Sequence, residues 1–110
     1  MMRRKSKVTE SSGNVFADLG LKDADEMLVK ATLALRIAKM IKARKLTQPA
    51  AAKVLGISQP KVSKLMNGDL YGFSTNQLFR LLNALGQDVE IVVRATSRRR
   101  QRGKLSVHAA

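Results

Sequence analysis

The sequence predicts a mainly α-helical fold: a compact body of four to five helices followed by one C-terminal β-strand. Three observations support this prediction. Apolar residues recur at the i, i+3/i+4 spacing of an amphipathic helix in several segments. Residues that cap helices precede these segments, and glycines follow them. Only the stretch 89–94 is rich in β-branched residues with partial alternation, which indicates a strand.

The first clear helix is expected to begin at Asp23 or Asp25 and to run to about Lys45. Glu26 lies in its first turn and Arg44 in its last turn, where each charge is favourable toward the helix dipole. One apolar stripe runs along this helix and is expected to face the core: Leu33, Ala34, Ile37, Ala38 and Ile41.

Two short helices follow within residues 47–68. Thr47 is expected to cap a helix over about 48–55, which Gly56 ends. Ser58 is expected to cap a second helix over about 59–66, which ends at Asn67 and Gly68. Two helices of about two turns, joined by a turn of about three residues that contains glycine, form a helix-turn-helix motif.

A last helix is predicted from Ser74, as its cap, to about Leu85, with Gly86 as its stop. Its leucines repeat at helical spacing and form a core or dimer stripe: Leu78, Leu81, Leu82 and Leu85. The strand at 89–94 has no second strand in the chain to pair with, so its backbone groups require another partner. We therefore expect it to pair with the same strand of a second copy.

Composition excludes several classes of function. The chain has 110 residues, enough for one domain, no cysteine and one histidine, His108. We therefore expect no enzyme, no metal site and no cofactor, because thiolates, imidazole pairs and nucleophile–base sets are all missing. Four aromatic side chains are too few for a single-strand binder built on stacked bases.

The positive charge is concentrated. Against 21 Lys and Arg there are 8 Asp and Glu, a net charge of +13. The stretch 27–68 contains nine bases and no acid, which favours a polyanionic partner. Residues 1–13 are expected to form a flexible basic arm, 14–95 the folded domain, and 96–110 a disordered basic tail. With neither a signal-peptide core nor a membrane-spanning run, we expect a cytoplasmic, nucleoid-associated protein without membrane contact.

Residues 46–68 closely resemble the Cro/C1-type (XRE) helix-turn-helix, the class of the lambda repressor. The match is an ordered set without a gap. It comprises Leu-Thr-Gln at 46–48, small residues at 50–52, Gly-Ile-Ser-Gln at 56–59, Val-Ser at 62–63 and Asn-Gly at 67–68. The flanking segments 13–21 and 71–94 resemble the compact subgroup related to HigA-type antitoxins. That resemblance implies a lambda-repressor-like fold, a transcriptional repressor and, in many members, a RelE-like toxin as partner.

The resemblance places the second helix of the motif in the major groove of double-stranded DNA. The expected base contacts are Gln59, Pro60, Lys61, Ser63 and Lys64. The expected phosphate contacts are Thr47, Gln48, Lys53, Ser58 and Asn67. The expected homodimer contacts on the strand are Val89, Ile91 and Val93, which would match a palindromic operator. Pro60 departs from the polar residue often found at that position in the family, which affects the base preference.

Three functions remain open at this point. The first is a repressor that is also the antitoxin of a type II toxin–antitoxin pair. The second is a stand-alone XRE-type regulator without a toxin. The third is a basic RNA-binding accessory protein that uses its charged ends.

Overall fold

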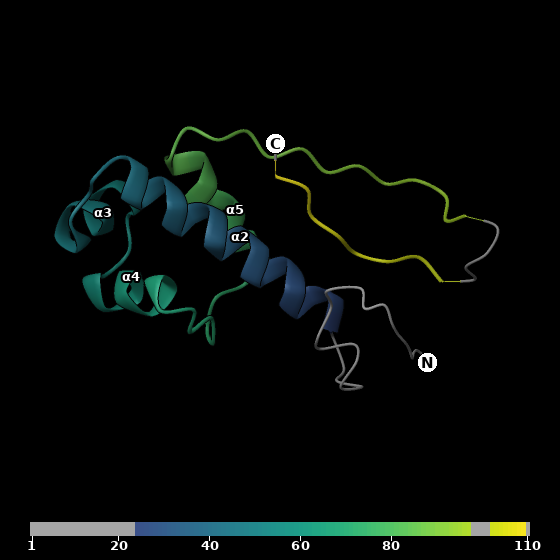
Figure 1. The fold of residues 1–110 in the computed structure, drawn as a ribbon, viewed down its shortest axis with the longest axis horizontal. Helices are drawn as coiled ribbons and strands as arrows, with labels where there is room; N and C mark the ends of the chain where they lie inside the picture. The colour runs from purple at the N-terminus through teal and green to yellow at the C-terminus, as the bar shows by residue number, and fades with distance from the viewer. Residues whose placement is uncertain (1–23, 98–101, 110) are drawn as a thin grey trace. The chain divides into compact units, whose positions relative to one another are not determined.

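The computed structural model describes residues 24–97 and 102–109. The predicted arm at 1–13 and the start of the domain at 14–23 lie outside the described residues. By their contacts, residues 30–92 form one compact unit, and the described residues 24–29, 93–97 and 102–108 belong to a second unit. The first of these units contains most of the helical structure and the helix-turn-helix (Figure 1).

Four helices make up the regular structure of the described residues. They are α2 (Ala24–Ala43), α3 (Gln48–Leu55), α4 (Gln59–Met66) and α5 (Thr75–Ala84). These bounds agree with the predicted helices to within two residues at each end, so the mainly helical fold is confirmed.

The short helices begin where side chains satisfy the free backbone N–H groups of the first turn. Thr47 accepts a hydrogen bond from the Ala50 N–H at 3.2 Å. At α5 the arrangement is reciprocal: the Ser74 hydroxyl accepts from the Gln77 N–H at 3.1 Å, and the Gln77 side chain accepts from the Ser74 N–H at 2.9 Å. This capping box fixes the start of α5 directly after the loop that follows α4.

Each helix ends in a residue of left-handed conformation, followed by a bond from the next N–H back to the helix. After α3 this residue is Gly56 (φ 71°), and the Ile57 N–H donates to the Ala52 carbonyl at 3.2 Å. After α2 it is Lys45 (φ 55°), with the Leu46 N–H bonded to the Ile41 carbonyl at 3.1 Å. Lysine pays a steric cost in this conformation that glycine avoids.

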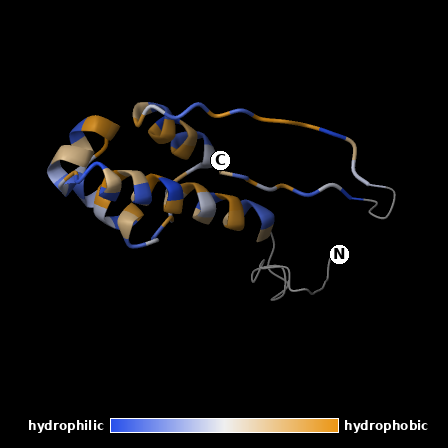
Figure 2. Cartoon of the chain, turned by 45° about the horizontal axis from the view of Figure 1, so that its top comes forward, coloured by the Kyte–Doolittle hydropathy of each residue, from blue (hydrophilic) through white to orange (hydrophobic). Residues whose placement is uncertain are grey.

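The core of the helical unit is apolar. The fully buried side chains of greatest volume come from three helices and the residue after α5: Ile37, Val62, Leu65, Leu78 and Leu85. Apolar and polar positions alternate around the helices, as Figure 2 shows. The apolar stripes predicted for α2 and α5 are buried, except for Ala38, which is half-buried. Phe73, in the loop before α5, is also buried although no periodicity marks it.

The strand expected at 89–94 is not present in the described single chain. Residues 87–97 carry no regular secondary structure. Ile91 and Val93 are 71% and 91% exposed, in a segment that Figure 2 shows as apolar. A strand exists only when its N–H and C=O groups pair with a neighbouring strand. β-Branched composition thus indicates that a segment can form a strand. The strand itself forms only when a neighbouring strand supplies the hydrogen-bond partners.

Candidate nucleic-acid interface

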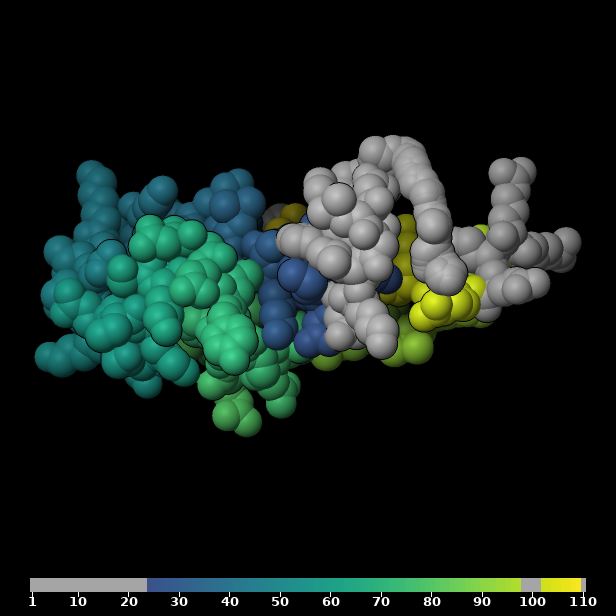
Figure 3. Space-filling view, turned by 90° about the horizontal axis from the view of Figure 1, so that it is seen from below, coloured from purple at the N-terminus to yellow at the C-terminus, as the bar shows by residue number. Residues whose placement is uncertain are grey.

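The motif at 47–68 folds as two packed helices. α3 and α4 pack against each other and are joined by a turn of three residues, Gly56, Ile57 and Ser58. Figure 3 shows the atoms of both helices gathered on one face of the molecule, in teal to green. The left-handed Gly56 reverses the chain direction, and the half-buried Ile57 lies in the turn. This arrangement leaves one side of α4 open to solvent.

The buried and open faces of α4 are set by its apolar residues. Val62 and Leu65 are buried, at 0% and 2% exposure. Gln59, Pro60 and Lys64 are exposed, whereas Ser63 and Lys61 are half-buried. The structure therefore brings four of the five predicted base-contact residues onto, or beside, the open face: Gln59, Pro60, Ser63 and Lys64. The amide and ammonium groups among them can pair with base edges in a major groove.

Lys61 is placed differently from the other predicted base contacts. Its ammonium lies over the ring of Phe73, 5.3 Å from the ring centroid. This is a cation–π contact between α4 and the loop that precedes α5. Sequence patterns could not reveal it, because the two residues are twelve positions apart and lie in different elements.

The predicted phosphate contacts lie at the ends of the motif's helices and on its surface. Thr47 and Ser58 are exposed N-caps, and each hydroxyl oxygen accepts a backbone N–H while its own hydrogen stays available to donate. Gln48, Lys53 and Asn67 are exposed as well. Both N-termini carry the positive end of a helix dipole, which favours an anion.

Two arginines of the acid-free stretch have partners within the fold. The Arg44 guanidinium donates to the Leu85 carbonyl at the end of α5. Arg36 donates to the Gln87 side-chain oxygen at 3.4 Å. Both arginines tie α2 to the C-terminus of α5, where unpaired carbonyls attract cations. The positive charge of the stretch is thus divided between holding the fold and facing solvent.

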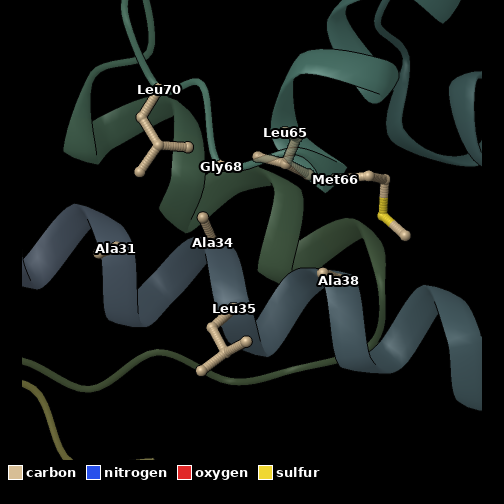
Figure 4. Close-up of a pocket in the computed structure, with 8 residues that line it drawn as sticks. All are labelled: Ala31, Ala34, Leu35, Ala38, Leu65, Met66, Gly68 and Leu70. Atoms are coloured by element: carbon tan, nitrogen blue, oxygen red, sulfur yellow. The ribbon is translucent and has the colours of Figure 1, made fainter.

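A hollow elsewhere in the helical unit is lined by no polar side chain. It encloses about 270 Å³ between α2, the end of α4 and the following loop. Ala34, Leu65, Met66 and Leu70 come from these elements, and Figure 4 shows them beside α2. Without a donor or a charge, this hollow offers nothing that would orient a nucleic acid.

The described residues contain neither a membrane-spanning helix nor a cluster of metal-ligating side chains. None of the four described helices has both the length and the apolar character needed to cross a membrane. Within residues 24–97 and 102–109, no three His, Cys, Asp or Glu side chains come together as metal ligands would.

Comparison with known proteins identifies the family. Residues 15–94 match the model of a helix-turn-helix domain family. A solved structure named as an XRE-family transcriptional regulator is 51% identical, with a TM-score of 0.76, and the match covers 80% of this chain and 99% of that chain. A Mycobacterium tuberculosis (strain ATCC 25618 / H37Rv) protein named as antitoxin HigA2 is 36% identical over 61 residues. Those residues are 56% of this chain and 60% of the relative, so the match spans less than two thirds of that relative. The chain belongs to the helix-turn-helix family and is a regulator of the XRE type.

Proposed function

We propose that the chain is a sequence-specific repressor that reads double-stranded DNA through the open face of α4. The observation that carries the proposal is the division of α4 between buried Val62 and Leu65 and the exposed Gln59, Pro60 and Lys64. The division leaves a polar surface about two turns long on a helix that is fixed in the fold by its other side. Such a helix fits the major groove.

Each polar or ring side chain on or beside the open face of α4 has a chemistry that suits a base edge. The Gln59 amide can donate to and accept from adenine N6 and N7, and Lys64 can donate to guanine O6 and N7. The Pro60 ring offers apolar contact to a thymine methyl, and the Ser63 hydroxyl can donate or accept. The exposed phosphate contacts set register and add affinity that falls with salt: Thr47, Gln48, Lys53, Ser58 and Asn67.

The proposal includes a homodimer formed through the segment 89–94. Ile91 and Val93 are exposed, and Val89 on the same side of an extended chain is half-buried. Pairing this segment with its copy about a two-fold axis would satisfy both backbones and cover the apolar side chains. Two α4 helices would then read half-sites of a palindrome about one DNA turn apart. Light scattering at tens of micromolar tests this, and a monomer would refute it.

The experiment for DNA reading is selection from a random duplex library, followed by affinity measurements on the selected sequence. Gln59→Ala is expected to relax the preference at one position of each half-site and to weaken binding about 5- to 150-fold, a loss of 1–3 kcal/mol. Asn76→Ala, an exposed amide on α5, is the matched control and should leave the selected sequence unchanged. An unchanged selection with Gln59→Ala would refute the role of α4.

The finer proposal is that this repressor is the antitoxin of a type II pair, with a RelE-like ribonuclease as its partner. The relative named as an antitoxin supports it. A neighbouring reading frame for a short basic ribonuclease, whose product co-purifies with this chain and loses activity on binding, would establish the pair. The absence of such a neighbour would favour the second candidate, a stand-alone XRE-type regulator. The third candidate, an RNA-binding accessory protein, predicts that excess RNA competes as well as the selected duplex.

A further inference from the structure

A small pocket beside α4 is lined by three polar side chains that can all donate hydrogen bonds. It encloses about 220 Å³ between the α3–α4 turn and α5. Its apolar lining includes Leu55, Phe73 and Leu81, and its polar groups are Lys61, Gln77 and Arg80. All three polar groups can donate hydrogen bonds, and two of them are cations.

Lys61 belongs to this pocket more than to the open face of α4. At about 100° per residue, Lys61 lies only about 70° around the helix from the mid-line of Val62 and Leu65. Pro60 lies almost opposite that mid-line. The ring of Phe73, 3% exposed, lies beneath the Lys61 ammonium at 5.3 Å. The ammonium is therefore held at the side of α4, toward the loop and α5.

The other two polar groups leave the pocket without an acceptor. The Gln77 side-chain oxygen already accepts the Ser74 N–H at 2.9 Å, which leaves its NH₂ group to donate. Arg80 is exposed. Among the described residues, no carboxylate forms an ion pair with Lys61 or Arg80. Two cations and one amide donor that line one pocket without a counter-charge are complementary to a phosphate oxyanion.

We propose that this pocket binds one phosphate group of the DNA backbone, held between Lys61 and Arg80. The inference rests on the proposed function and changes one role within it: Lys61 contacts phosphate instead of a base edge. Phe73 is the positioning residue, because its ring keeps the ammonium over the pocket. A phosphate fixed at this point would set the depth and register with which α4 enters the groove.

The test is the salt dependence of duplex affinity for the full chain and for Lys61→Gln, Arg80→Gln and the double variant. Two probes are used: the selected duplex and a random-sequence duplex of equal length. Each single variant should weaken binding to both probes by the same factor. The double variant should lower the slope of log K against log salt by about 0.9 per protomer, or about 1.8 for the proposed dimer, because the two cations of each protomer neutralise one phosphate. Between 50 and 200 mM salt, the unaltered dimer would then lose about 12-fold more affinity than the double variant.

Two further variants separate positioning from folding. Phe73→Leu keeps an apolar side chain under Lys61 and removes the ring. It should lower the salt slope in the unaltered chain but not in the Lys61→Gln background. Lys42→Gln, which removes an exposed lysine outside the pocket, is the charge-matched control and should leave the slope unchanged.

Four results would overturn the proposal that this pocket binds a backbone phosphate. They are a relaxed base preference with Lys61→Gln, unchanged slopes, a double-variant slope loss near 3.6 for the dimer (about two separate phosphates per protomer), or saturation by inorganic phosphate that DNA does not displace. Equal affinity of the unaltered chain for both duplexes would instead refute sequence-specific reading, and the slope measurement on the random duplex would still decide the pocket.

Discussion

Lys45→Gly should stabilise the protein, although it removes a side chain. Lys45 is the only non-glycine residue with positive φ among the described residues, at 55°, and it is the second residue after the end of α2. A side chain in the left-handed region costs about 1–2 kcal/mol. Glycine recovers that strain but makes the unfolded chain more flexible, which costs about 0.4–1 kcal/mol. The net expectation is a gain of about 0.5–1 kcal/mol in the free energy of unfolding.

Urea unfolding followed by circular dichroism measures this gain, at a protein concentration held constant because a dimer would make stability depend on concentration. Lys45→Ala is the matched control: it removes the same charge but keeps the strained φ, so it should not stabilise. Lys42→Gly, inside α2, should destabilise by about 1 kcal/mol. If Lys45→Gly were no more stable than Lys45→Ala, backbone strain at the end of α2 would not be the cause.

Three further outcomes are expected from the same unfolding assay. Gly56→Ala should destabilise by about 0.5–1.5 kcal/mol through backbone strain alone, because a methyl group there meets no atom within 4 Å; a larger loss would mean that the turn is tighter than it is here. Ser74→Ala should cost about 1 kcal/mol by removing the α5 cap, and Ser74→Asp should restore most of that loss; equal stability of the two variants would contradict the capping box. Leu78→Ala should cost about 2–5 kcal/mol, because Leu78 is fully buried; a loss below 1 kcal/mol would contradict its place in the core.

Most of the helical fold could be predicted because it depends on interactions between residues that are close in the sequence. Ser74 and Gln77 cap α5 across three residues, and Gly56 ends α3 within one turn. Such interactions join residues only a few positions apart, so the order of residue types predicts them. The apolar stripes follow for the same reason, since helical spacing places Leu78, Leu81 and Leu82 on one side wherever the helix is packed.

The contacts that determine which cations face the interface join residues that lie far apart in the sequence. Arg44 caps the end of α5 across 41 residues, and Lys61 meets Phe73 from another element. No periodicity separates such a lysine from an exposed one like Lys64. The segment 89–94 has a composition that suits a strand. The described single chain nevertheless supplies no neighbouring strand to pair with it.

By itself, then, the sequence determined the four helices, the helix-turn-helix, and the surplus of positive charge that selects a polyanion. Each depends on neighbours within a few residues or on composition alone. Only the tertiary structure decided which cations hold the fold, as Arg36 and Arg44 do, and which face solvent, as Lys53 and Lys64 do. The reason is physical: a cation acts through whichever anion, carbonyl or ring the fold brings near it.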